Sequence, residues 1–179
     1  MKYLNIVIVI AVIIVIYLIK TYNYFKSQKQ EIEKQRSGIE IALTSRYDIL
    51  TKLNNTVCGY TKHETGVFTD VTKIRNGMSI DDLSKADEEQ HLAFSKLNML
   101  AENYPDLKAG ANFIQLQDSV NDVENTIQAT RRLYNNEVSK YNSKIESFPS
   151  CIIAKKLNVQ HEAYFAADAA KTEDVTLKF

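Results

Sequence analysis

An unbroken apolar run near the N-terminus constrains this chain more than any other feature. Residues 6–19 read IVIVIAVIIVIYLI, without a charged or amide side chain. Ile and Val are typical of β-strands in water, but this run is much longer than an ordinary strand of about 5–6 residues. In hydrocarbon a lone segment has to satisfy its own backbone hydrogen bonds, and it does so as a helix. The sequence therefore predicts an N-terminal transmembrane helix, whose lipid-facing residues include Ile6, Ile10, Ile14 and Ile19.

The flanks of the run decide between an anchor and a leader that is removed. A span needs about 17–25 residues, and residues 3–19 reach the lower end of that range. Lys20 can extend to the interface, and Tyr22 suits it. A cleaved signal peptide is the alternative, but the following KTYNYF has no pair of small residues for cleavage. We therefore expect an uncleaved anchor over residues 1–25.

Basic residues near the ends of the run predict its orientation. Only Lys2 precedes the run, whereas the residues after it are rich in lysine. Lysine and arginine concentrate on the cytoplasmic side of a span. The bias predicts a single-pass protein of the cytoplasmic membrane with its C-terminal domain in the cytoplasm. The basic residues after the run are Lys20, Lys26, Lys29, Lys34 and Arg36.

The chain after the anchor is patterned in heptads. Two rows in steps of seven, one from Ile32 and one from Arg36, alternate at spacings of four and three as far as Met78. Such rows are typical of an amphipathic helix with one continuous apolar seam. They predict a helix from about Gln28 to Arg75 that can continue directly from the span. The two rows are Ile32, Ile39, Arg46, Leu53, Tyr60, Val67, Ile74 and Arg36, Leu43, Leu50, Val57, Glu64, Val71, Met78.

Stop and start signals divide the rest of the chain into further helices. Gly77 suits the left-handed position after a helix, and Ser79 with Asp82 forms a capping box for the next one. The second seam comprises Leu83, Ala86, Gln90, Ala93, Leu97, Leu100 and Tyr104. Pro105 suits a first helical position, and Pro149 closes the last long helix. The seam of that last helix comprises Phe113, Leu116, Val120, Val123, Ile127, Tyr134, Val138, Tyr141, Ile145 and Phe148.

The predicted fold class is all-α. An N-terminal transmembrane helix is followed by a bundle of three long helices, which short connections would make antiparallel, and by a short C-terminal helix. Residues 151–157 form an apolar stretch, and residues 159–170 are predicted to be the short helix. Five glycines and two prolines are too few for an all-β fold. We expect an anchor at 1–25, a helical domain at 26–170 and a tail at 171–179.

Polar residues interrupt the seams at several positions. Arg46, Glu64 and Gln90 stand where apolar side chains are expected, and a buried charge has to be paired. We expect Arg46 to meet an acid from another helix, namely Asp118, Asp122 or Glu124. Such pairs commonly set helix register, so a structural role is favoured over ligand binding.

A second polar group lies on the last long helix. Arg131 and Arg132, together with Tyr134 and Tyr141, could form an anion-binding strip. The favoured interpretation is that the two tyrosines pack in the core and one arginine lies at the surface. We therefore treat Arg131, Tyr134 and Tyr141 as candidate interaction residues.

No constellation in the sequence indicates catalysis. His63-Glu64 and His161-Glu162 each resemble half of an HExxH motif, but the second histidine is missing from both. The two cysteines lack the spacing of a metal or redox site. Basic and acidic residues number 22 each and alternate along the chain, which disfavours nucleic-acid binding. We predict no enzyme, no catalytic residue, no cofactor, no metal and no small-molecule substrate.

Several segments resemble the LemA family of bacterial membrane-anchored proteins. The resemblance implies an N-terminal anchor, an α-helical bundle and an accessory role in the bacterial envelope, which places the span in the inner (cytoplasmic) membrane. It supplies no catalytic residues. The segments are SRYDIL at 45–50, GYTKHE at 59–64, AENYPDLKA at 101–109, NF at 112–113, LQ at 116–117, RRLYN at 131–135, YN at 141–142 and FPS at 148–150.

These observations predict a non-enzymatic scaffold or interaction protein at the membrane, with a protein partner or a second copy on its helix faces. The alternative is a sensor that binds a ligand or a metal, or an accessory to a membrane enzyme. A closed polar cavity around Arg46, Glu64 and His63 would favour the alternative.

Overall fold

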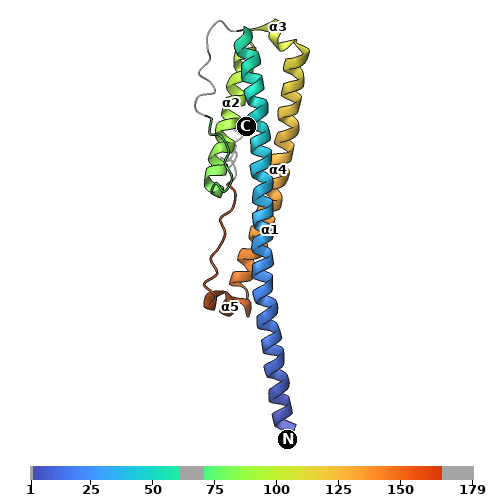
Figure 1. The fold of residues 1–179 in the computed structure, drawn as a ribbon, viewed down its shortest axis with the longest axis vertical. Helices are drawn as coiled ribbons and strands as arrows, with labels where there is room; N and C mark the ends of the chain where they lie inside the picture. Colours follow the sequence, from blue (N-terminus) through green and yellow to red (C-terminus); the bar gives the residue numbers. More distant parts are fainter. Residues whose placement is uncertain (1, 61–70, 167–179) are drawn as a thin grey trace, which may run out of the picture. The chain divides into compact units, whose positions relative to one another are not determined.

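The computed structural model describes residues 2–60 and 71–166, and the regular secondary structure of these residues is entirely helical. The predicted all-α class is thereby confirmed. Figure 1 shows the ribbon with its helices labelled along the chain. They are α1 (Lys2–Tyr60), α2 (Ile80–Ala101), α3 (Pro105–Lys108), α4 (Ala111–Glu146) and α5 (Ser150–Lys156).

The first helix joins the apolar run to the heptad seam without a break. By length and composition, α1 is able to cross a membrane, and it is the one helix of the described residues with that property. Ile6, Ile10, Ile14 and Ile19 are 55%, 52%, 53% and 56% exposed. A core helix of a water-soluble domain would bury most of these side chains. The run is therefore not the core helix of a soluble domain. Its two remaining interpretations are a membrane span and a signal sequence.

The chain divides into two compact units. One comprises residues 1–34 and 134–164, and the other comprises residues 35–133 and 165–179. We call them the first unit and the second unit. The predicted division at 1–25, 26–170 and 171–179 stays a prediction, and residues 171–179 lie outside the described part of the chain.

The second unit has an apolar core between α1, α2, α3 and the first half of α4. Leu50, Leu53 and Val57 from α1 pack with Leu97 from α2 and Phe113 from α4. The predicted seam of α1 is buried from Ile39 to Val57. Ser79 caps α2 as predicted, because its hydroxyl accepts from the Asp82 amide at 3.1 Å.

Helix directions within the second unit differ from the predicted antiparallel order. Residue numbers rise together along α1 and α2: Arg36 donates to the Met78 carbonyl at 3.5 Å, and Arg46 meets Asp87 further along. The two helices are therefore parallel, whereas Gln117 bonds Asn98 and Arg131 bonds Asp87, so α4 is antiparallel to α2 (Figure 1).

The extent of the first helix also differs from the prediction. A helix was predicted as far as Arg75, whereas α1 is described as far as Tyr60, and residues 71–75 are not helical. Residues 61–70 of the predicted helix lie outside the described part of the chain.

Two other predictions in this region fare differently. Gly77 is left-handed with φ of 79°, as expected, but it lies in a turn and does not cap α1. Glu64, together with His63 and Val67, lies outside the described residues.

The first unit pairs the base of α1 with the end of α4. Gln28 donates to Glu137 at 2.5 Å, and the Tyr141 ring meets the edge of Phe25 at 5.8 Å between centroids. Further along, the Lys144 ammonium lies 5.6 Å from the centre of the Tyr24 ring. Residue numbers fall along α1 as they rise along α4, so the two segments are antiparallel. In the predicted order, with short connections between successive helices, the first and last long helices would have been parallel.

The short C-terminal helix is formed by other residues than predicted. It is α5, over the stretch that the sequence marked only as apolar, whereas residues 159–166 of the predicted helix are not helical and residues 167–170 lie outside the described part. Phe148, predicted as the last seam residue, is 82% exposed because α4 ends at Glu146.

Candidate functional site

A buried arginine gathers three helices of the second unit around one point. Arg46 is 1% exposed and lies on the seam of α1. Its Nε donates to Gln90 Oε1 at 2.9 Å, and its Nη1 donates to Glu124 Oε2 at 2.5 Å. Nη2 donates to the Asp87 carboxylate at 2.5 Å and to the Asp87 carbonyl at 2.8 Å. Three of the guanidinium's nitrogens are thus bonded, to α2 and to α4.

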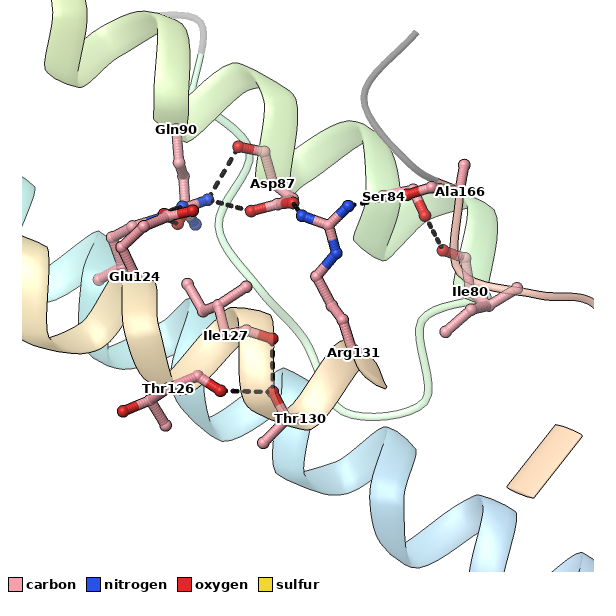
Figure 2. A network of polar contacts seen from close by, with 11 residues as sticks. Ile80, Ser84, Asp87, Gln90, Glu124, Thr126, Ile127, Thr130, Arg131 and Ala166 are labelled. Atoms are coloured by element: carbon pink, nitrogen blue, oxygen red, sulfur yellow. Dashed lines mark hydrogen bonds and ion pairs between the residues drawn. The ribbon is translucent and has the colours of Figure 1, made fainter. Parts of the chain in front are cut away.

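A second arginine completes the network from α4. Arg131 Nη1 donates to the other Asp87 oxygen at 2.9 Å, so this carboxylate bridges two guanidinium groups (Figure 2). Arg131 Nη2 donates to the Ala166 carbonyl at 2.9 Å. The same guanidinium lies 4.6 Å above the centre of the buried Phe165 ring.

The charges of this network balance. Arg46 and Arg131 supply two positive charges, and Asp87 and Glu124 supply two negative ones. Breaking a buried pair is costly because it leaves an uncompensated charge. The Gln90 amide nitrogen is buried without a hydrogen-bond partner in the described part of the chain. The arrangement fixes α1, α2 and α4 at one register and leaves no net charge to attract a charged ligand.

A different set of polar contacts holds the C-terminal segment to the first unit. The Asn142 side chain bonds both backbone groups of Glu162, donating to its carbonyl at 2.9 Å and accepting from its amide at 3.0 Å. The Tyr134 hydroxyl donates to the Ala163 carbonyl at 2.9 Å. Helix formation would need these same backbone groups, which explains why residues 159–166 are not helical.

Two side chains of the first unit, Lys29 and Tyr141, have shifted pKa values. A hydrogen bond and the opposite charge of Glu162, 3.1 Å away, raise the pKa of Lys29. Burial raises the pKa of the Tyr141 hydroxyl; Lys29 opposes that shift and Glu162 adds to it. Both pKa shifts depend on contacts of the folded first unit, so unfolding changes the pH at which Lys29 and Tyr141 lose their protons.

The candidate interaction residues of α4 serve separate contacts. Tyr134 and Tyr141 are 2% and 3% exposed in the first unit, Arg132 is exposed, and Arg131 belongs to the network of the second unit. The structure gives no shared strip of these residues in either unit.

Sequence reasoning missed two important side chains, Asp87 and Asn142. Asp87 follows Leu83 by four positions and precedes Gln90 by three, so the spacing placed it on the seam of α2. The signal was present, but Ala86 beside it was taken as the seam residue. Asn142 likewise follows Val138 by four positions and precedes Ile145 by three, but Tyr141 beside it was taken as the seam residue.

The described residues contain no group of three or more histidine, cysteine, aspartate or glutamate side chains able to hold a metal ion. His161 Nε2 lies 3.1 Å from Glu146, while Glu162 pairs with Lys29. Cys58 and Cys151 are unbridged.

Comparison with known proteins identifies relatives along most of the chain. The sequence model of the LemA family matches residues 35–179. The chain is also 30% identical over 158 residues to Protein LemA of Metamycoplasma hominis, which covers 86% of this chain and 72% of that protein.

Replacing Arg46 by methionine should lower the free energy of unfolding by about 3 kcal/mol or more, because buried Asp87 and partly buried Glu124 lose a shared cation. The measurement is urea unfolding of the full chain in detergent, followed by circular dichroism. Arg132→Met is the matched control at an exposed position and should change little. Equal effects of the two substitutions would contradict a stabilising role of the network.

Stability of the first unit should fall as the pH rises above about 10. Lys29 and Tyr141 have raised pKa values in the folded state, so the unfolded chain loses these protons first. Their contribution is complete below the ordinary values near 10 and is lost as the pH passes through the folded values. Melting temperature against pH measures the effect. Tyr141→Phe should flatten the alkaline slope, whereas Tyr164→Phe at a half-exposed site should not.

Proposed function

Because this chain belongs to the LemA family, we propose that it is a non-enzymatic scaffold or accessory interaction protein, anchored in a bacterial cytoplasmic membrane by the start of α1. One observation carries the proposal. The exposed apolar run belongs to the same continuous helix whose later part builds the core of the second unit. The helical surface is therefore held beside the bilayer.

Packing beyond the run supports a retained anchor over a cleaved signal peptide. Thr21 and Phe25, immediately after the run, are 3% and 4% exposed within the first unit. Phe25 packs on Tyr141 of α4. The residues after the run also lack the pair of small side chains that cleavage of a signal peptide needs. The anchor explains both the exposed run and the buried residues after it.

Lysines around the end of the run support a cytoplasmic location for the helical part. Lys20 and Lys26 follow the run on α1, and Lys144 stands on α4 against Tyr24. Lys155 and Lys156 are exposed at the end of α5 in the same unit. These charges add to the bias already present in the sequence, and they belong on the inner face of the membrane.

Exposed apolar side chains in the second unit support an interaction role. Ile41, Leu92 and Met99 are 69%, 52% and 71% exposed. Leu92 and Met99 are seven residues apart and so share one face of α2. By contrast, the polar groups around Arg46 are bonded to one another, which leaves little for the alternative of a ligand sensor.

The orientation can be tested with single cysteines in a chain whose two native cysteines are replaced by serine. Lys96→Cys, on the exposed side of α2, should react with a membrane-impermeant maleimide only after cells are permeabilised. Labelling of intact cells to the same extent would place the helical part outside and contradict the cytoplasmic location. Met1 extended by a cysteine-bearing peptide is the control for the opposite side.

The interaction role can be tested by photo-crosslinking in intact cells. A photo-reactive residue at Leu92 or Met99 should give a specific, saturable product, whereas one at exposed Lys52 on α1 should give much less. A chain of residues 1–25 alone is the anchor control. A product of twice the chain mass would identify a second copy as the partner. Background labelling at all three positions would contradict the scaffold role.

A further inference from the structure

The register of α1 against α4 places one end of the first unit at the end of the apolar run. Gln28 meets Glu137, Phe25 meets Tyr141, and Tyr24 meets Lys144. Each step toward the C-terminus of α4 is a step toward the N-terminus of α1. Continued at the same rise, Glu146 at the end of α4 lies at about the level of Lys20. The turn and α5 that follow therefore begin where the apolar run ends.

Residues 147–157 form a tip that exposes large apolar side chains at this level. Phe148 is 82% exposed, Ile152 is 61% exposed and Leu157 is 43% exposed. Single exposed apolar residues are common, but three within one turn and one short helix form an unusual concentration. Because they lie at the end of the run, their surroundings differ from those of an ordinary surface.

Hydrogen bonds and packing hold the tip in one conformation, so its apolar side chains are exposed on an ordered part of the structure. Ser150 is fully buried, and its hydroxyl donates to the Lys144 carbonyl at 2.7 Å and to the Ser147 carbonyl at 2.8 Å. Ala154, one turn later on α5, is 1% exposed. With one side of α5 packed inward, Ile152 is presented outward together with Phe148.

Positive charge surrounds the apolar residues of the tip. Lys155 and Lys156 end α5. On α1, Lys26 lines the same hollow as Leu157, and the helix register places Lys20 at the level of Glu146. Glu146, at the end of α4, lies 3.1 Å from His161 Nε2, and the lysines of this corner outnumber it. A hollow of about 290 Å³ adjoins the tip, lined by Lys26 and Leu157 among others. Apolar side chains within a basic surround are typical of segments that lie in the interface of an anionic membrane.

We propose that residues 147–157 are a second membrane contact, in which Phe148 and Ile152 enter the interfacial layer of the bilayer that α1 spans and the lysines meet anionic lipid headgroups. The inference rests on the proposed membrane anchoring. Its consequence is mechanical: a single span leaves the first unit free to swing, whereas two contacts hold it at one orientation to the bilayer.

The chain has no tryptophan, so one introduced at the tip reports its own surroundings without background. The experiment places Phe148→Trp, in the full chain, in vesicles of phosphatidylcholine and phosphatidylglycerol, with or without brominated acyl chains. The expected result is emission at shorter wavelength than in water and several-fold quenching by the brominated lipid. Ile152→Trp is a second reporter and should behave alike.

Tyr164→Trp is the matched control. Tyr164 is 50% exposed in the same unit and follows Ala163, whose carbonyl is bonded to Tyr134, three turns of α4 away from the tip. Twelve residues of helix separate Tyr134 from Glu146, or about 18 Å at 1.5 Å per residue. Its emission should remain that of a half-exposed side chain, with little quenching by brominated lipid.

Flotation of the same vesicles distinguishes membrane anchoring by α1 from the second membrane contact at residues 147–157. If the protein floats with the vesicles but the tip tryptophans are quenched no more than the control, the tip contact is overturned and the anchor stands. If the protein does not float, the proposed anchoring itself fails. Equal quenching of the tip in vesicles without phosphatidylglycerol would overturn the role of the lysines, whereas a marked loss would support it.

Discussion

A guanidinium group removed from water has to recover through hydrogen bonds and opposite charge what it loses in hydration. Arg46 does so with partners from two other helices, and Asp87 shares its second oxygen with Arg131. Because these bonds are directional, a shift of α2 or α4 by one helical turn would leave a buried charge unpaired. Apolar packing around Leu50 and Phe113 supplies burial but tolerates sliding far better. The network therefore selects one register from several that would bury similar area.

Polar side chains of α4 also bond backbone groups of the C-terminal segment, which has no regular secondary structure over residues 159–166. Asn142 and Tyr134 bond the backbone of Glu162 and Ala163 in the first unit, and Arg131 bonds that of Ala166 in the second unit. Each of these three residues stands in the RRLYN and YN segments on which the family resemblance rested. This gives the segments a structural explanation that requires no catalysis.

Much of the fold was predictable from single residues and their spacing. The α1 seam through Val57, the Ser79 cap and the end of α4 before Pro149 all depend on local chemistry, and the structure has them where the sequence placed them. The pairing of Arg46 with an acid of another helix was expected, and Glu124 was one of three candidates. Asp87 was not, although its seam spacing was visible. The spacing of a seam predicts which side of a helix is buried. It does not predict which of two neighbouring residues, Ala86 or Asp87, contacts the Arg46 guanidinium.

By itself, the sequence determined the elements that depend on contacts within one helix or on the solvent around it. A run of Ile and Val too long for a strand has to be a helix in hydrocarbon, and heptads have to bury one face. Only the tertiary structure decided what depends on partners distant in sequence. The parallel course of α2 beside α1 depends on contacts such as those of Arg46 with Asp87 and Gln90, more than forty residues along the chain. The segment at 159–166 is kept from helix by side chains twenty or more residues away, whose effect no local pattern records.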